Sequence, residues 1–425
     1  MAGTVRLRHV AEVNPATPEF DRLGDDEPVT FLPLEAVWPG TALDTSRVRS
    51  MVEVNSGYTR FRTGDILIPK ITPTFQANRS VIATGLLGGV GAGTTELHVV
   101  RPGPCLDVRY LLYTLSSQPF LQEGEASMVG VAGQKRVPDE HLRDLPVLLP
   151  PIGKQRAIAD YLDAETARLD AVVKRRRAQL VAIRDRLASE VERRVLGFLG
   201  ASGRASQPSP FFQSRPGDWR ETTLRHLGVE VQTGPFGSQL HAEEYVEGGT
   251  PIINPMHLVD GGIVPSNNMT VADEKRRDLS RHSLDVGDIA VARRGELGRV
   301  AVVDQASAGY LCGTGCLRLR PRRSLVRSGY LSMLLSSAPL RAYFDTASVG
   351  STMDNLSAET LLAAPVLVPP LEEQADIELA VGMARGHEEG VTGLMSRQIE
   401  LLLERRQALI TAAVTGQPAI PGVAA

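Results

Sequence analysis

In two long stretches of the chain, apolar residues recur with helical periodicity, and each stretch predicts one long helix. The first extends from Pro150 to Gly197, and its apolar positions recur every seven residues with polar residues between them. Prolines directly before such a pattern and a glycine directly after it are typical start and stop signals of a helix. A helix of this extent would be roughly 60 Å long. The seven-residue repeat indicates a seam between two helices.

The same pattern returns between Pro369 and Gly416, with every landmark shifted by 219 residues. The globular blocks that precede the helices also correspond, since Tyr110–Pro119 (YLLYTLSSQP) matches Tyr330–Pro339 (YLSMLLSSAP). An internal duplication explains both observations. The sequence therefore predicts an α+β protein with two similar mixed α/β domains, separated by two long antiparallel coiled-coil helices in a pseudo-twofold internal repeat.

The predicted organisation follows from this repeat. It comprises a first domain at 1–149, a first long helix at 150–197, a linker at 198–217, a second domain at 218–368, a second long helix at 369–416 and a tail at 417–425. The linker is assigned from its Ser, Pro and Gly content. Gly382, Gly386, Gly390 and Gly393 fall inside the second helix, where each costs up to about 1 kcal/mol against alanine. We therefore expect that part of the helix to be bent, frayed or closely packed against a neighbour.

The composition is that of an ordinary globular protein, with 42% hydrophobic and 22% charged residues. No apolar run reaches the ~18 residues of a membrane span, and the N-terminal MAGTVRLRHV lacks the apolar core of a signal peptide. A cytoplasmic protein is expected. The three cysteines, Cys105, Cys312 and Cys316, belong to no zinc-binding pattern, so we expect buried free thiols and no metal site.

The formal net charge of −3 looks unsuited to a nucleic-acid-binding protein, yet such binding depends on local basic surfaces. Residues 151–200 hold eleven basic and seven acidic side chains, whereas residues 370–425 hold four basic and eight acidic ones. Opposite charge on the two helices favours their packing against each other. Chance, with both helices simply solvated, is the alternative.

The ends of the long helices carry the most specific motifs in the chain. They are PPIGKQRAIADYLD from Pro150, PPLEEQADIELA from Pro369, and ERRQALITAAVTGQ near the C-terminus. The second domain adds TGPFGSQL (Thr233–Leu240), GDIAVARRGELGRVAVV (Gly287–Val303) and CGTGCLRLRP (Cys312–Pro321), and GDILIPKITPTFQANRS (Gly64–Ser80) is a variant of the middle one. Over nearly its whole length, the chain resembles the specificity subunit of Type I restriction–modification systems. It departs from that family in the glycines of the second helix and in Gly153-Lys154, where Glu-Glu is usual.

The resemblance implies a non-enzymatic DNA-binding subunit. Its two target-recognition domains would each read one half of a bipartite double-stranded DNA target, with the long helices as the spacer between them. The helices would also bind two modification subunits, which transfer methyl groups from S-adenosylmethionine to adenine, so no cofactor is expected in this chain. Restriction or translocase subunits would join a complex that also cuts DNA. Two similar readers related by a twofold axis also suit two half-sites on one face of a duplex.

Polar and basic side chains on loops flanked by glycine or proline are the candidate DNA contacts. In the first domain they are Lys70, Thr72, Thr74, Gln76, Asn78 and Arg79, which follow a predicted strand, and Gln134, Lys135 and Arg136, which follow a glycine hinge. In the second domain they are Arg293, Arg294 and Arg299, together with Ser351, Thr352 and Asn355, which match residues 134–136 by position. Polar surface turns without a ligand are the alternative. Gly234, Phe236 and Gly237 are interpreted as shaping a turn, and Lys174–Arg177 as a solvated or partner-facing patch.

Two other classes of function are weighed against DNA recognition. A methyltransferase is disfavoured because the glycines at 85–93 lack G-x-G-x-x-G spacing, with Thr94 where a glycine is required. Asn254-Pro255-Met256-His257 lacks the second proline and the aromatic residue of an adenine-flipping motif, and no histidine lies in a metal or catalytic-triad pattern. A coiled-coil scaffold whose domains bind proteins is not excluded, because a polar loop does not identify its ligand.

Overall fold

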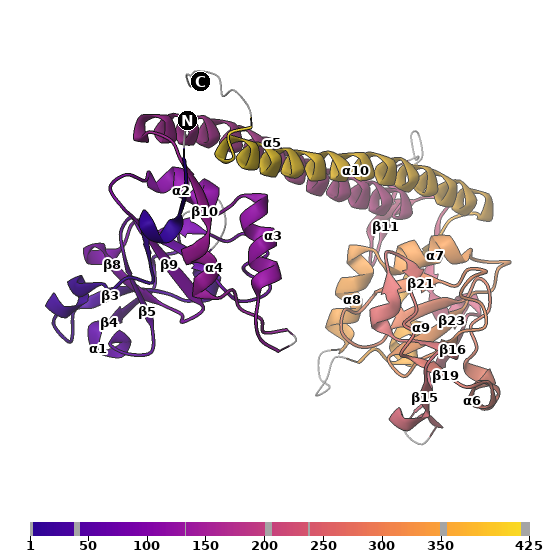
Figure 1. The fold of residues 1–425 in the computed structure, drawn as a ribbon. Helices are drawn as coiled ribbons and strands as arrows, with labels where there is room; N and C mark the ends of the chain where they lie inside the picture. The colour runs from indigo at the N-terminus through magenta and orange to yellow at the C-terminus, as the bar shows by residue number, and fades with distance from the viewer. Residues whose placement is uncertain are drawn as a thin grey trace. The chain divides into compact units, whose positions relative to one another are not determined.

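The computed structural model describes residues 3–37, 43–131, 133–199, 206–236, 239–348 and 355–417. The chain forms two compact units. The first comprises Met1–Ala178 together with Met395–Ala425, and the second comprises Gln179–Leu394. Each unit therefore contains one sheet-rich domain and parts of both long helices (Figure 1). The domain limits given above stay a prediction, because this division cuts both long helices.

The domain of the first unit is built from short strands and short helices. The strands are β1 (Gly3–Arg6), β2 (Ala11–Val13), β3 (Pro28–Leu32), β4 (Val48–Ser50), β5 (Thr59–Arg62), β6 (Ile66–Pro69), β7 (Val81–Ile82), β8 (Val90–Gly93), β9 (Leu97–Pro102) and β10 (Pro146–Leu149). The helices are α1 (Met51–Val54), α2 (Val108–Thr114), α3 (Gln118–Ser127) and α4 (Asp139–Asp144), and the long α5 (Ile152–Val195) follows β10. The strands pair in the orders β2-β9-β6-β7, β4-β3-β8-β5 and β1-β10, with β3 and β8 parallel.

The domain of the second unit repeats this arrangement. Its strands are β13 (Arg220–Thr223), β14 (Glu230–Thr233), β15 (Tyr245–Val246), β16 (Thr250–Ile253), β17 (Leu258–Val259), β18 (Gly262–Ile263), β19 (Thr270–Val271), β20 (Ile289–Ala292), β21 (Val300–Val302), β22 (Leu311–Cys312), β23 (Cys316–Arg320) and β24 (Pro365–Val368). Its helices are α6 (Asp273–Asp278), α7 (Ser328–Leu335), α8 (Ala338–Ser348) and α9 (Ala358–Ala363), and the long α10 (Leu371–Val414) follows β24. The orders β14-β23-β20-β21 and β13-β24 correspond to β2-β9-β6-β7 and β1-β10 of the first domain, and the parallel pair β16–β22 corresponds to β3–β8. The predicted fold class is thereby confirmed.

In both domains, an equivalent ion pair between an arginine and a buried aspartate fixes the turn before an interior strand. In the first domain, the guanidinium of Arg101 on β9 bonds both carboxylate oxygens of Asp65, at 2.8 and 2.9 Å. In the second, Arg320 on β23 bonds both oxygens of Asp288 at 2.7 Å. Each aspartate also accepts the backbone N–H of the residue three positions before it. A bidentate pair fixes orientation as well as charge, so it aligns the two strands that it joins.

The long helices α5 and α10 pack against each other in an antiparallel sense in each unit (Figure 1). In the first unit, Asp170 on α5 pairs with Arg406 on α10 at 3.0 Å. In the second unit, Arg184 lies 4.0 Å from Glu388. The partners' residue numbers therefore rise along one helix and fall along the other. Neither these helices nor any other helix in the described residues is long and apolar enough to cross a membrane.

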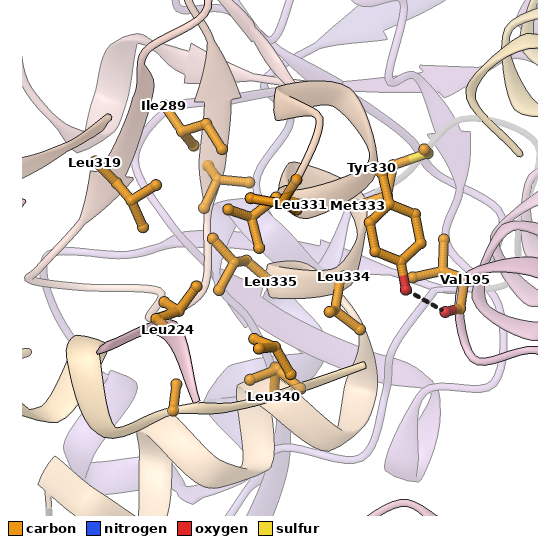
Figure 2. Packing of buried hydrophobic residues seen from close by; sticks show 14 of the residues in the cluster. Val195, Leu224, Ile289, Leu319, Tyr330, Leu331, Met333, Leu334, Leu335 and Leu340 are labelled. Carbon is orange, nitrogen blue, oxygen red and sulfur yellow. Dashed lines mark hydrogen bonds between the residues drawn. The ribbon is translucent and has the colours of Figure 1, made fainter. Parts of the chain in front are cut away.

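Each domain also contacts the end of the long helix that does not follow it in sequence. The buried hydroxyl of Tyr330 on α7 lies 3.1 Å from the carbonyl oxygen of Val195 at the end of α5, and Figure 2 shows this bond beside the leucine core. Tyr110 on α2 stands in the same relation to Val414 at the end of α10, at 3.4 Å. Burial raises the pKa of Tyr110 to about 12, so its hydroxyl stays a donor at neutral pH.

The stretch predicted as a linker folds in part into a hairpin. β11 (Ser206–Ser209) and β12 (Gln213–Pro216) pair antiparallel there. Phe212, in the turn between them, is buried in the same hydrophobic cluster as Trp219. The high serine and proline content predicted an unstructured linker. The hairpin is ordered because the aromatic residues of its turn pack against the core of the second domain.

Cys312 and Cys316 are buried free thiols, as predicted, whereas Cys105 is exposed and the prediction was wrong for it. Burial raises the pKa of the Cys312 thiol to about 12, which keeps it protonated at neutral pH. Cys105 lies in the turn before α2, where its backbone carbonyl accepts a hydrogen bond from Gln155 and its side chain remains at the surface.

Helix α10 continues through Gly382, Gly386, Gly390 and Gly393, so the prediction of fraying was wrong. A Cβ at any of these positions would meet no heavy atom within 4 Å, which also rules out close packing inside the described part of the chain. Replacing Gly386 and Gly390 with alanine is therefore expected to raise the unfolding free energy of the second unit, by up to about 1 kcal/mol per site. Urea unfolding of the full chain measures this change.

Gly234→Ala is the matched control for those substitutions. A Cβ at Gly234 would overlap the carbonyl oxygen of Gly313, so the same chemical change should destabilise the second unit there. Destabilisation by the α10 alanines as well would show that the helix needs its glycines for packing, against the open surface seen here.

Candidate nucleic-acid interface

The structure brings the two candidate segments of the first domain together on one surface. The loop that begins at Lys70 leaves the end of β6, and the segment 134–136 runs beside it. Ile71 and Arg136 form an antiparallel bridge. The N–H of Thr72 donates to the carbonyl oxygen of Lys135 at 3.0 Å. Candidates that are about sixty residues apart in sequence therefore share one site.

Several candidate side chains in this surface already have partners within the domain. Thr74 and Asn78 donate to backbone carbonyl oxygens at 2.7 and 3.3 Å. Gln76 donates to the carboxylate of Glu125 on α3. Arg79 is half-buried and also has an interaction partner. These bonds fix the shape of the loop, so the four side chains position the surface, and DNA contact by each of them stays a prediction.

The basic groups that remain available on this surface are lysines. Arg136 is taken up by a bidentate ion pair with Glu96, with oxygens at 2.7 and 2.9 Å. This bond holds the pKa of Glu96 below its ordinary value, and the positive charge of Lys70 adds to the effect. Lys70 and Lys135 form no ion pair with any described residue. Together with the exposed Gln134, they give the loop a donor-rich face.

Arg293 in the second domain occupies the position that Lys70 occupies in the first. Arg293 directly follows β20, as Lys70 directly follows β6, and both strands are interior in their sheets. The backbone N–H and C=O of both residues bond two neighbouring segments at 2.8 to 3.0 Å. The partners are Gly315 and Leu356 for Arg293, and Glu96 and Val137 for Lys70. The backbone of each domain thus presents one basic residue at a fixed place.

The side chain of Arg293 is buried, with only 6% of its surface exposed. Its Nε donates to Oδ1 of Asn355 at 2.9 Å. Its guanidinium carbon lies 5.0 Å from the centre of the Phe236 ring. The neighbouring Arg294 is exposed, and Arg299 forms an ion pair within its own loop. The structure therefore brings together Arg293 and Asn355, which the sequence had placed in separate segments.

Other candidates of the second domain are placed differently. Ser351 and Thr352 lie outside the described residues, as does Gly237 of the predicted turn. Gly234 lies against the backbone of Gly313, where only a residue without a Cβ fits, and its predicted role in shaping a turn stays a prediction. Phe236 does more than shape the turn, since its half-exposed ring covers Arg293. The sequence feature that could have indicated this role of Phe236 was an aromatic residue in a segment rich in glycine and proline.

Residues 216–378, which contain every described candidate of the second domain, match the family of the Type I restriction modification DNA specificity domain. Over these residues, the chain is similar to that family. We refer to residues 216–378 as the specificity domain.

The specificity-domain family is also represented among curated relatives. The specificity subunits of the Type I restriction enzymes EcoAI and EcoEI, both from Escherichia coli, are 40% identical over 156 residues and 39% identical over 158 residues. Each match covers 36% of this chain and 26% of the relative. The matched part thus spans about a quarter of the length of these relatives.

Solved structures share the fold over almost the full chain, beyond the specificity domain. A chain of a type I R-M system has a TM-score of 0.74 at 17% identity, and covers 98% of both chains. The HsdS subunit from Thermoanaerobacter tengcongensis has a TM-score of 0.52 at 18% identity, over 98% of this chain and 97% of that one. The first domain therefore belongs to the same architecture as the specificity domain, although the family match does not include it.

Proposed function

We propose that this chain is the DNA-specificity subunit of a Type I restriction–modification complex. Each of its two domains would read one half of a bipartite double-stranded DNA target. The observation that carries the proposal is the duplicated fold, with a basic residue fixed at the same strand end in both copies, Lys70 and Arg293. Arginine, lysine, asparagine and glutamine are the side chains whose donors match base edges in the major groove.

The long helices support a role as spacer and docking surface. α5 and α10 are each 44 residues long, about 66 Å at the α-helical rise. Their ion pairs, Asp170–Arg406 and Arg184–Glu388, join the basic helix to the acidic one. A paired helix is much stiffer than a flexible linker, so it can keep a separation between two readers. In the proposed complex, the same helices bind two modification subunits.

Methyl transfer belongs to the partners in this proposal. The modification subunits would bind S-adenosylmethionine and methylate adenine, and this chain would supply the choice of sequence. A system that also cuts DNA would add restriction or translocase subunits. Because the proposed complex would act on cellular DNA, we expect it in the cytoplasm.

Two assays on the purified full chain separate this function from its rivals. Methyl transfer is measured with the chain alone, and binding to a randomised duplex library is measured with and without a modification subunit. The proposal expects no methyl transfer by the chain alone and enrichment of a defined duplex by the complex. Methylation by the chain alone would instead identify an enzyme, and complex formation without sequence enrichment would identify a protein scaffold.

Lengthening both helices tests their role as the spacer. Seven residues are inserted in α5 between Val172 and Leu187, and seven in α10 between Glu388 and Arg406, so that the antiparallel pairing is kept. The number of unspecified base pairs between the two half-sites should change, because the paired helices grow by about 10 Å. Both half-site sequences should stay the same. An unchanged gap in the selected duplexes would show that the helices do not set it.

A further inference from the structure

Within the described part of the chain, Arg293 is a buried cation without an anionic partner. Its guanidinium has one neutral acceptor, Oδ1 of Asn355, and one aromatic neighbour, the ring of Phe236. Its Nη1 is buried and has no hydrogen-bond partner in the described part of the chain. A buried charge is costly unless it is paired, and a buried donor without an acceptor adds to that cost. Burial and the neighbouring charge of Arg294 lower the pKa of Arg293, in keeping with this cost.

Two arginines at equivalent places in the two domains do have carboxylate partners. Arg101 and Arg320 each bond both oxygens of a buried aspartate. In those places the fold needs the arginine, because it neutralises a carboxylate inside the domain. Arg293 neutralises nothing that the structure describes, and removing its charge would relieve a cost to the free domain. Such a residue is retained where a ligand supplies the missing partner.

We infer that Arg293 is the pre-positioned DNA-binding donor of the specificity domain, held by Asn355 and Phe236 for a hydrogen-bond acceptor of the duplex. This inference rests on the proposed function. The acceptor is O6 and N7 of a guanine, or an oxygen of a phosphate group, since both bind a guanidinium in the same way. The half-exposed ring of Phe236 covers the donor, so contact with the duplex requires this ring to move aside. Asn355 sets the guanidinium's orientation through Nε.

The equivalent position in the first domain is Lys70. The same pair of backbone bonds fixes it, and its ammonium forms no ion pair with a described residue. Each domain therefore offers one unneutralised cation at the same strand end. A difference between lysine and arginine at this place allows the two halves of the target to differ, because only the guanidinium can bond two acceptors in a fixed plane.

The decisive variant gives Arg293 an anionic partner. Asn355→Asp places a carboxylate on the Nε of the guanidinium, so the melting temperature of the full chain should rise while DNA affinity falls. Arg293→Met removes the cation and should likewise lower affinity without loss of melting temperature. Asn268→Asp is the matched control, because it adds the same charge at an exposed position of the same domain. There the backbone N–H, which the substitution keeps, donates to the hydroxyl of Ser266.

The probe is the duplex that the wild-type complex selects from a randomised library, with variants of that duplex at each base pair. Asn355→Asp and Arg293→Met should each lower affinity about 5- to 150-fold, the loss expected for one bidentate contact. Loss of discrimination at one base pair of one half-site identifies guanine as the acceptor. A phosphate is identified by an equal loss of affinity for all sequences, together with a slope of log affinity against log salt concentration that is smaller by about one.

Unchanged affinity, discrimination and salt dependence in both variants would overturn the inference, while the proposed function would stand on the wild-type selection. Equal losses in Asn268→Asp would overturn it too, since the effect would then be one of net charge. A wild-type complex that selects no sequence would refute the proposed function itself, and with it the role of Arg293.

Discussion

Replacing Arg101 with methionine is expected to lower the unfolding free energy of the first unit by about 3–5 kcal/mol. The substitution leaves Asp65, which is 1% exposed, as a buried carboxylate without its cation. The two bonds that it removes, at 2.8 and 2.9 Å, are the ones that join β9 to the turn before β6. Lys70 lies at the far end of β6, so the surface that we propose to face DNA should lose order together with the sheet.

Urea unfolding combined with hydrogen exchange of the full chain measures this loss unit by unit. Arg397→Met is the control, because Arg397 and Glu400 are both 61% exposed and an exposed pair contributes at most about 1 kcal/mol. The second unit should be unaffected by either change. A cost below about 1 kcal/mol for Arg101→Met would contradict the structural role of the buried pair.

Replacing Gln155 with alanine should cost the first unit about 2–5 kcal/mol. Gln155 lies in the first turn of α5 and is fully buried. Its Oε1 accepts the N–H of Asp107 at 2.8 Å, and its Nε2 donates to the carbonyl oxygens of Cys105 and Pro150 at 2.9 and 2.8 Å. Alanine leaves these backbone groups without partners and opens a cavity at the start of the long helix.

Gln374 makes the matching bonds at the start of α10, so Gln374→Ala should act on the second unit in the same way. Gln134→Ala is the control, because that side chain is exposed and should change the unfolding free energy by less than about 0.5 kcal/mol. The readout is again unit-resolved hydrogen exchange. Equal destabilisation of both units by Gln155→Ala alone would contradict a local anchoring role.

Much of the architecture could be predicted from the sequence because the chain contains two similar copies of it. Pro150 and Gly197, with their equivalents Pro369 and Gly416, predicted long helices that the structure places at Ile152–Val195 and Leu371–Val414. Local signals were sufficient there, since helix ends depend on neighbouring residues. The shared strand orders followed from the repeat itself.

What the sequence could not show depends on contacts between distant residues. The sequence indicated Arg293 and Arg294 equally as candidate DNA contacts, whereas the structure buries the first beneath Phe236 and leaves the second at the surface. The direction of a side chain at a strand end is set by its partners, and Asn355 is 62 positions away in sequence. The bonds from Tyr110 and Tyr330 to the ends of the other long helices were hidden for the same reason.

The central claim is that one chain reads two separate DNA sequences through two copies of one fold. Sequencing of methylated adenines in cells that carry this chain with its modification subunits tests it most directly. The account predicts a single motif composed of two short defined sequences at a fixed distance, with unspecified base pairs between them. A contiguous motif without a gap, or methylation that does not depend on this chain, would contradict it.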